Sequence, residues 1–495
     1  MMSRLAKLTK PLIPLLNTRR IFSFTRYRSM STSGQGGYDS WSKEKLIEKL
    51  LQYEKREQTP TVNASSAGGE SSLLTTFKRK FNSSGEPIKS KKKKKNKYGP
   101  KVKRNQRPFD ITKYPKRHIA LKVAYFGWDY YGFASQGENG TVETVEDQLF
   151  RALLGARLIA DPLTCNYSRC GRTDKGVSGL GQVIALDIRS NIPQGDDVQE
   201  GGAHIEEIGY IDTINKQLPK DVRVIAWSPV EDTFNARFDC RWRKYKYYFP
   251  RGTLNIEKML EGAKLFLGTH DFRNFCKIDA AKQIYNYERT ILDVDIRKME
   301  GVDFPSPELE FYELNLTGTA FLWHQVRCMM AILFNIGQGL EEPSLVQKML
   351  DVDALPSKPN YEMASDLPLV LFDCHFDKID WQFDNKSSMI GLSRLHKHVL
   401  QQWNVYTAQS MMFTAMYKEL GSLAISPPSD SPCKWSEYVA AGKNKSVGTN
   451  IVLGAGRGLR VNTYIPMLER PRQEPFDILN ARYSNRRQPN AEASD

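Results

Sequence analysis

The stretch from Gly171 to Gly176 (Gly-Arg-Thr-Asp-Lys-Gly) has the residue types and spacing needed to present one carboxylate for chemistry. Its glycines allow the backbone to turn sharply and to come close to a ligand. The strand pattern that follows, Gln182 to Ile188, indicates that Asp174 stands on a loop held just ahead of a sheet. Such a carboxylate can act as a nucleophile or as a base. The alternative is a turn residue that binds only its own backbone, which is the commoner role of an Asp between glycines.

A second candidate stretch is the strand pattern Arg241 to Phe249, which is rich in Arg, Lys and Tyr. Its period of two places Arg243 and Tyr245 on the same face. These residue types suit phosphates and stacked bases. The alternative is a plain exposed sheet whose amphipathic side chains keep their polar ends in water.

The third stretch, Phe321 to Gly337, reads as a helix that is almost wholly apolar after Gln325. Arg327 lies inside it. A buried guanidinium needs an anionic partner, for which Asp174 is the candidate. The alternative is that Arg327 faces water where the helix begins, and His324 reads as a structural residue.

The order of strand and helix patterns predicts an α+β fold. Two successive sets of elements each read as one ferredoxin-like (RRM-like) unit. We expect the units to form a continuous, mainly antiparallel sheet with helices on one face. Strands are expected at 118–126, 182–188, 222–230, 241–249, 290–300, 308–317 and 370–376, and helices at 144–158, 205–217, 254–267 and 321–337.

Five motifs give the chain a specific resemblance to the TruA-type tRNA pseudouridine synthases. The family signature, Gly-Arg-Thr-Asp-x-Gly-Val followed by a Gln, stands here as Gly171 to Val177 and Gln182. The other motifs follow the family's order at 127–136, 234–238, 243–247 and 321–327. The resemblance covers residues 118–380 and looks closest to the eukaryotic branch that modifies uridines 38 and 39 of the tRNA anticodon stem-loop.

The resemblance implies an isomerase that breaks the glycosidic N–C bond of uridine and rejoins the base through carbon. This reaction involves no redox change, so it implies no cofactor and no metal. The uridine would be flipped out of the stem into an RNA-binding cleft. Asp174 would be the nucleophile or initiating base, Tyr245 would stack on the flipped base and assist proton transfer, and Arg327 would hold the carboxylate ionised. The expected substrate contacts are Arg172, Arg169, Arg243, Tyr131, Leu369 and Leu371.

Two other functions stay open. One is a synthase of the same family with broader tRNA and small nuclear RNA targets, which the Phe-Ala-Ser-Gln end of the first motif disfavours. The other is an RNA-binding or chaperone protein on the same scaffold, which would have no need for Asp174, Tyr245 and Arg327 together. We expect tRNA as the partner. We also expect a homodimer, because bacterial members of the family are dimers.

The positive charge of the chain is concentrated in its N-terminal part. Residues 1–117 contain 29 Lys and Arg against 8 Asp and Glu, a net charge of +21, whereas the whole chain carries +15. Residues 118–495 therefore carry a net charge of −6. Any nucleic-acid surface on the folded body must come from local clusters of Arg and Lys.

The first 38 residues contain no acidic residue and interleave Arg and Lys with Leu, Ile, Phe and Ser, which is typical of a mitochondrial presequence. A disordered basic tail is the alternative, and a start at Met30 would omit this segment. The lysine-rich run at 89–107 favours nuclear import and phosphate attraction. We therefore expect a protein of the nucleus and cytoplasm, with a possible mitochondrial form.

Cysteine usage and hydropathy argue against a metal site and against a membrane span. Seven cysteines with no regular spacing fit a reducing compartment, and Cys165 with Cys170 makes at best half a metal site, so no metal is expected. The longest apolar run, near Cys328 to Phe334, is too short to span a bilayer, so no membrane partner is expected.

The expected organisation has five parts. They are a presequence or basic tail (1–38), a short helix with a linker and the lysine-rich run (39–107), two catalytic subdomains (108–233 and 234–384) and a C-terminal helical extension (385–495). Within the extension we expect a long helix at 389–420, a flexible stretch at 421–449 and an end that packs back on the body at 464–483.

Overall fold

The computed structural model describes residues 109–136, 142–192, 206–301, 304, 306–383, 389–427, 431–440 and 448–487. The predicted presequence, the short helix with its linker and the lysine-rich run lie outside these residues. Most of the residues between 190 and 204 also lie outside them. The described residues belong to one of two units, Asn105–Asp495.

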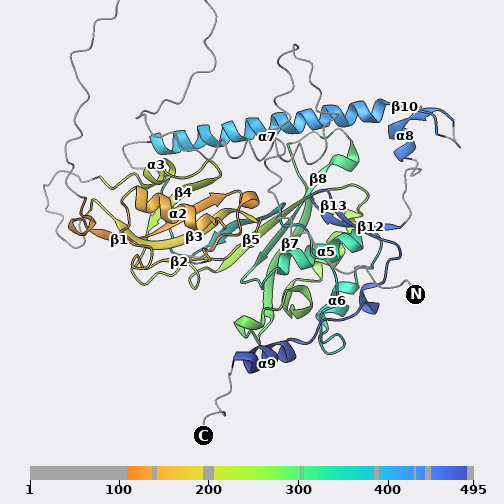
Figure 1. The fold of residues 1–495 in the computed structure, drawn as a ribbon, viewed down its shortest axis with the longest axis horizontal. Coiled ribbons are helices and arrows are strands. Elements are labelled where there is room, and N and C mark those ends of the chain that lie inside the picture. The colour runs from red at the N-terminus through yellow and green to blue at the C-terminus, as the bar shows by residue number, and fades with distance from the viewer. Residues whose placement is uncertain are drawn as a thin grey trace, which may run out of the picture. The chain divides into compact units, whose positions relative to one another are not determined.

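A nine-stranded sheet forms the centre of the fold (Figure 1). Its order is β4-β1-β3-β9-β5-β8-β7-β6, and β2 pairs with β3 outside this path. The prediction of a continuous, mainly antiparallel sheet is confirmed, since β3–β9 is the one parallel pairing in that path. The strands are Lys116–Tyr125 (β1), Ser168–Arg169 (β2), Ser178–Arg189 (β3), Val222–Pro229 (β4), Trp242–Pro250 (β5), Gly268–Asp271 (β6), Glu288–Lys298 (β7), Phe311–Gly318 (β8) and Leu369–His375 (β9).

Strand β9 joins the two halves of the sheet. It pairs in parallel with β3 through Gly179 and Leu371, and antiparallel with β5 through Leu371 and Tyr245. Sequence periodicity predicts β9 but not its neighbours. This insertion brings the start of β3, which directly follows the Asp174 loop, to the same part of the sheet as Tyr245.

The helices pack around the two halves of the sheet. Helix α2 begins with a capping box, in which Thr144 and Asp147 each bond the other's backbone N–H. The four helices predicted between residues 144 and 337 exist, and all four are shorter than expected because turns or irregular backbone replace their first or last residues. The helices are Val145–Gly155 (α2), Tyr210–Asn215 (α3), Ile256–Lys264 (α4), Gln325–Gly337 (α5) and Leu345–Leu350 (α6).

Helix α5 forms the buried support of the second half. Twelve of its residues are buried, including Cys328, Phe334 and Gly337, but Arg327 is only half-buried. The helix begins at Gln325 rather than at Phe321, because His324 adopts a left-handed backbone conformation with φ of 62°. Residues 321–324 therefore form a turn instead of a first helical turn.

The C-terminal part begins with the long helix α7 (Ile390–Ser422), which Figure 1 shows running past α3 and β4 toward β10 and α8. Its first half is fixed to the body, where Arg394 forms an ion pair with Asp212 and the rings of Tyr406 and Trp128 meet edge to face at 5.6 Å. No helix among the described residues combines the length and apolar character required to cross a bilayer.

The residues after α7 contain more structure than the sequence indicates. The stretch expected to be flexible includes β10 (Ala424–Ile425), β11 (Cys433–Lys434) and α8 (Trp435–Ala440), and an unpredicted hairpin follows, β12 (Thr449–Gly454) and β13 (Arg457–Val461). The chain then lies against the body, where Tyr464 donates a hydrogen bond of 2.6 Å to Glu341 and Met467 is fully buried. It ends in α9 (Phe476–Arg487).

Candidate active site

The loop that carries Asp174 is held by backbone contacts with the loop after β1, residues 127–136, which we call the aromatic loop. The N–H of Phe133 donates to the carbonyl of Thr173 at 3.2 Å, and the N–H of Gly176 donates to the carbonyl of Tyr130 at 3.2 Å. At Gly132, where φ is +97°, a Cβ would lie 2.8 Å from the Thr173 carbonyl oxygen. The close approach of the two loops therefore requires glycine on the aromatic loop.

Two polar residues of the signature, Thr173 and Gln182, hold the other end of the Asp174 loop. The buried Gln182 donates from Nε2 to the carbonyl of Gly171 at 2.8 Å. The hydroxyls of Tyr125 and Thr173 share a buried hydrogen bond of 2.8 Å. These two bonds fix the backbone on either side of Arg172 and so determine where Asp174 points.

The Asp174 carboxylate meets two side chains from the turn before α5. The indole Nε1 of Trp323 donates to its Oδ1 at 3.1 Å, and Nε2 of His324 lies 3.5 Å from its Oδ2. Its side chain is 23% exposed, so the carboxylate is accessible to a substrate but largely removed from water. Burial raises the pKa of Asp174 to about 6, against the lowering effects of Arg327 and of the Trp323 hydrogen bond.

Arg327 acts on Asp174 from a distance. Its Nε donates to the carbonyl of Ala364 at 2.8 Å, and no ion pair among the described residues joins its guanidinium to Asp174. Its charge nevertheless lowers the pKa of the carboxyl. The structure thus shows a longer-range interaction in place of an ion pair, and the role of Arg327 in holding the carboxylate ionised stays a prediction.

Tyr245 lies on β5 beside the same site. Its ring meets Phe321 edge to face at 4.9 Å, and its neighbour across the sheet is Leu371. Burial, followed by the nearby Cys374 and Asp174 side chains, raises the pKa of Tyr245 well above its usual value. The phenol therefore stays protonated at neutral pH and can donate a proton or a hydrogen bond.

The two leucines expected to line the pocket lie in the hydrophobic core. Leu369 and Leu371 are 4% and 1% exposed, and both belong to β9. Leu371 supports the sheet beside Tyr245 through the cross-strand pairing. A contact between either leucine and a substrate base stays a prediction.

Two of the predicted substrate contacts are accessible on the surface. Arg172 is exposed, two residues before Asp174. Tyr131 is 44% exposed, and the Lys175 ammonium lies 3.9 Å from the centre of its ring. This cation–π pair places a positive charge and an aromatic face on opposite loops beside the carboxylate.

The remaining two arginines are engaged in internal contacts. Arg169 forms an ion pair with the buried Glu146. The guanidinium of Arg243 donates to three backbone carbonyls, those of Thr319 (2.6 Å), Arg237 (3.0 Å) and Cys170 (3.2 Å). Arg243 thus ties three segments of the site together, and the phosphate contacts expected of both arginines stay predictions.

Sequence reasoning missed Trp323 and assigned His324 no contact with Asp174. Trp323 is held by two lysines, since the ammonium groups of Lys277 and Lys282 lie 4.9 Å and 5.1 Å from its ring. His324 has a buried Nδ1 without a hydrogen-bond partner among the described residues, and burial lowers its pKa to about 4. Only their place in the motif at 321–327 could have pointed to them, because a left-handed backbone at a histidine has no signal in the sequence.

Comparisons with known proteins identify the family of the chain. A family model described as "tRNA pseudouridine synthase" matches residues 263–377. The "tRNA pseudouridine(38/39) synthase" of Homo sapiens is 41% identical over 382 residues, which cover 74% of this chain and 77% of the relative. The chain belongs to the TruA-type tRNA pseudouridine synthase family.

Other relatives show how far the similarity of this synthase extends. The protein of the same name from Saccharomyces cerevisiae is 37% identical over 456 residues, 91% of this chain and 92% of the relative. The "tRNA pseudouridine synthase A" of Methanosarcina mazei is 33% identical over 285 residues, which cover 94% of that protein but 57% of this synthase. The matched part of this synthase therefore corresponds to nearly the whole length of the archaeal protein.

Proposed function

We propose that this synthase converts the uridines at positions 38 and 39 of tRNA to pseudouridine, with Asp174 as the nucleophile or initiating base. The relatives from Bos taurus, Homo sapiens and Saccharomyces cerevisiae, whose similarity covers 74%, 74% and 91% of this chain, are named for these two positions. The observation that carries the chemistry is the Asp174 carboxylate, held by two glycine-containing loops, accessible, and bonded by an indole N–H.

The protonation states of the site suit the isomerisation. With a pKa of about 6, Asp174 is mostly ionised at neutral pH, as a nucleophile or base must be. The phenol of Tyr245 is protonated. In the reaction the bond between N1 and C1′ breaks, a bond between C5 and C1′ forms, and the proton of C5 is lost while N1 gains one. Tyr245 beside the carboxylate is suited to donating to the detached base.

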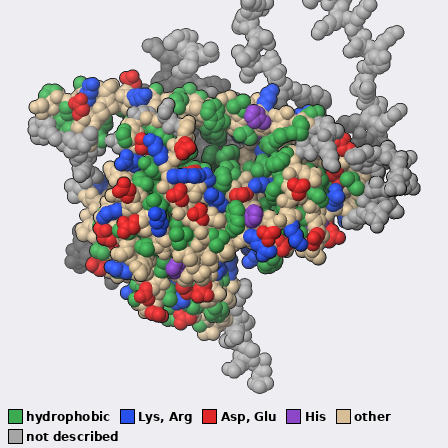
Figure 2. All heavy atoms as spheres, turned by 180° about the vertical axis from the view of Figure 1, so that it is seen from behind, with side chains coloured by type: hydrophobic (Ala, Val, Ile, Leu, Met, Phe, Trp, Pro, Cys, Tyr) green, Lys and Arg blue, Asp and Glu red, His purple; other side chains and the backbone are tan. Residues whose placement is uncertain are grey.

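The surface around the site supports contact with a folded RNA. On the face shown in Figure 2, Lys and Arg side chains are interspersed with Asp and Glu rather than forming one basic field. Arg172, Lys175 and Tyr131 provide a local group of cations with an aromatic ring beside Asp174. We place the flipped nucleotide's flanking phosphates against this group.

The test is the replacement Asp174→Asn with an assay for pseudouridine. We expect loss of pseudouridine at positions 38 and 39 of unmodified tRNA and retention of tRNA binding. Asp161→Asn, a matched change at a turn that caps its own backbone, should leave the product unchanged. Product from Asp174→Asn at the wild-type rate would refute the catalytic role.

The same assay distinguishes the other two functions. Product at additional tRNA or small nuclear RNA positions would support the synthase with broader targets. Tight tRNA binding by the wild-type protein without any pseudouridine would support the RNA-binding or chaperone function. Mapping pseudouridine across total RNA with and without the protein covers all three outcomes.

We also propose a homodimer formed through the second half of α7. A helix of 33 residues is about 50 Å long at 1.5 Å per residue, and its body contacts are concentrated in its first half. Beyond them, Phe413, Met416, Tyr417 and Leu420 are 74%, 60%, 52% and 46% exposed. An exposed apolar surface of this kind marks an interface, and a second copy presents the same surface.

The dimer is tested by the mass of the protein in solution. Phe413→Glu combined with Tyr417→Glu should convert a dimer to a monomer in light scattering after gel filtration. Ala415→Glu adds a charge on the opposite side of the same helix and should leave the mass unchanged. A wild-type monomer at micromolar concentration would refute the proposal.

We propose that residues 1–38 direct a mitochondrial form and that the lysine-rich run at 89–107 directs the nuclear one. The support is the composition of the two segments. A start at Met30 should abolish mitochondrial import of a fluorescent fusion and leave nuclear import intact. Mitochondrial signal from that shorter form would refute the first assignment.

A further inference from the structure

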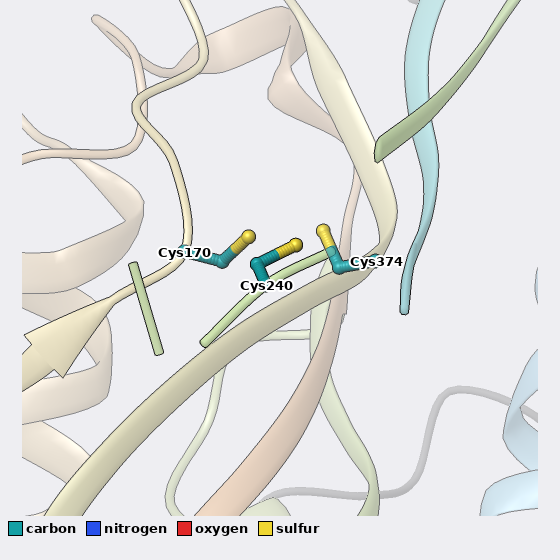
Figure 3. Close-up of side chains that lie close together, drawn as sticks. All are labelled: Cys170, Cys240 and Cys374. Atoms are coloured by element: carbon teal, nitrogen blue, oxygen red, sulfur yellow. The ribbon is translucent and has the colours of Figure 1, made fainter. Parts of the chain in front are cut away.

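Three buried cysteines from separate segments meet beside the catalytic loop. Cys170 directly precedes the Asp174 loop, Cys240 lies just before β5, and Cys374 belongs to β9. Their Sγ atoms all lie within 4.8 Å of one another, and Figure 3 shows the three thiols directed into one common space. The residues are 3%, 8% and 2% exposed, and none of them is in a disulfide.

We propose that Cys170, Cys240 and Cys374 together bind one thiophilic metal ion, Zn²⁺ or Cu⁺, as thiolates. Thiolate sulfur is the ligand that these two ions prefer in proteins. At a metal–sulfur distance of about 2.3 Å, a tetrahedral site needs sulfur atoms about 3.8 Å apart. The observed limit of 4.8 Å leaves adjustments of about 1 Å, which rotation of the cysteine side chains can supply.

A positive charge lies beside the cluster, since the guanidinium of Arg243 donates to the carbonyl of Cys170 at 3.2 Å and Cys374 is the cross-strand neighbour of Arg243. Binding of the ion would release the thiol protons of its ligands, as at any site formed by cysteines. Three thiolates with Zn²⁺ would leave one negative charge, which the charge of Arg243 offsets.

The coordination of the ion follows from the number of ligands. The described residues supply no fourth Cys, His, Asp or Glu to this group. A Zn²⁺ ion would therefore complete its tetrahedron with water on the side of Cys240, the most exposed of the three, whereas Cu⁺ would be three-coordinate. The alternative is a cluster of neutral thiols, in which Cys240 keeps its hydrogen bond of 3.3 Å to the carbonyl of Trp242.

A metal at this point would hold the site together without entering the reaction. The three ligands belong to the backbone leading into the Asp174 loop, to the entry of the strand that carries Tyr245, and to the strand between the two halves of the sheet. Cys374 is the cross-strand neighbour of Arg243, which already bonds the carbonyl of Cys170. This proposal departs from the sequence-based expectation of no metal and does not depend on the proposed function.

The first experiment measures metal bound by the untagged full-length protein. The reduced apoprotein is given Zn²⁺ or Cu⁺ separately under anaerobic conditions, freed of unbound ion, and analysed for metal and protein. We expect one equivalent of one of these ions, and the two arms decide which. Co²⁺ should also give a thiolate-to-metal charge-transfer band. Less than a tenth of an equivalent in both arms would overturn the proposal.

Cysteine variants test the identity of the ligands. Cys170→Ser, Cys240→Ser and Cys374→Ser should each abolish the charge-transfer band, whereas Cys165→Ser, a buried thiol outside the cluster, should keep it. If the cluster variants fail to fold, alkylation of the wild-type protein decides, since bound metal should protect these three thiols and chelation should expose them. Unprotected thiols, or a disulfide between two of them in the metal-treated protein, would overturn the proposal.

Discussion

The hydrogen bond from Trp323 to Asp174 should set the pH dependence of activity. The indole N–H donates to Oδ1 at 3.1 Å and lowers the pKa of a carboxyl that burial raises to about 6. Trp323→Phe keeps an aromatic ring between the two lysines and removes the N–H donor. The carboxyl should then hold its proton to higher pH, because the ionised form has lost a stabilising bond.

The size of the shift follows from the energy of the bond. A hydrogen bond to a charged group contributes about 1.5–3 kcal/mol, and one pKa unit corresponds to about 1.4 kcal/mol. Because the Asp174 side chain is 23% exposed, water screens part of this energy and we take the lower limit, a rise of about one unit. At pH 7 the ionised fraction would fall from about nine-tenths to about one-half.

The assay follows release of label from tRNA that contains uridine tritiated at C5, between pH 5 and pH 9. The acid limb of kcat/KM, which reports the free enzyme, should lie near pH 6 in the wild type and near pH 7 in Trp323→Phe. Trp435→Phe, a matched change in α8, should leave the limb in place. An unshifted limb with a uniformly lower plateau would show that Trp323 acts by packing and would refute the reasoning.

Three further predictions concern stability. Asp174→Asn should raise the free energy of unfolding by up to about 3 kcal/mol at pH 8, because the pKa of the Asp174 carboxyl is about 6 in the folded state and 3.8 in the unfolded chain, which disfavours the ionised native state. In urea titrations this gain should shrink below pH 6 and vanish below about pH 3.8. His324→Val should lower the free energy of unfolding, measured by thermal unfolding, by about 1–3 kcal/mol. His324→Asn should lower it less, because asparagine tolerates a φ of 62°. Gly176→Ala should unfold in less urea than Gly252→Ala, since both have positive φ but only Gly176 has a side chain, Asp366, 2.4 Å from the added Cβ; equal midpoints would contradict the contact.

Local patterns in the sequence determined the elements and the central carboxylate. Periods of two and 3.6 predicted strands and helices because they depend on which side chains face the core, a property of neighbouring residues. Glycines on either side of Asp174 predicted an accessible loop because their backbone freedom is local. The order of the motifs indicated the family, and the division of charge indicated that the body has no bulk positive field.

Only the tertiary structure decided which side chains meet at Asp174. Trp323 and His324 reach the carboxylate because a left-handed residue ends the turn before α5, while Arg327 points toward the carbonyl of Ala364. No local pattern encodes these contacts, since they depend on how α5 packs under the sheet.

Tertiary structure also decided the partners of two arginines and of the clustered cysteines. Arg169 and Arg243 carry the charges expected of phosphate contacts, but Glu146 and three carbonyls from distant segments engage them. The cysteine cluster likewise joins positions far apart in the sequence, because β9 inserts between β3 and β5. The sequence determined the residue types and the elements that carry them, whereas long-range packing, which brings distant segments within a few ångströms, determined their partners.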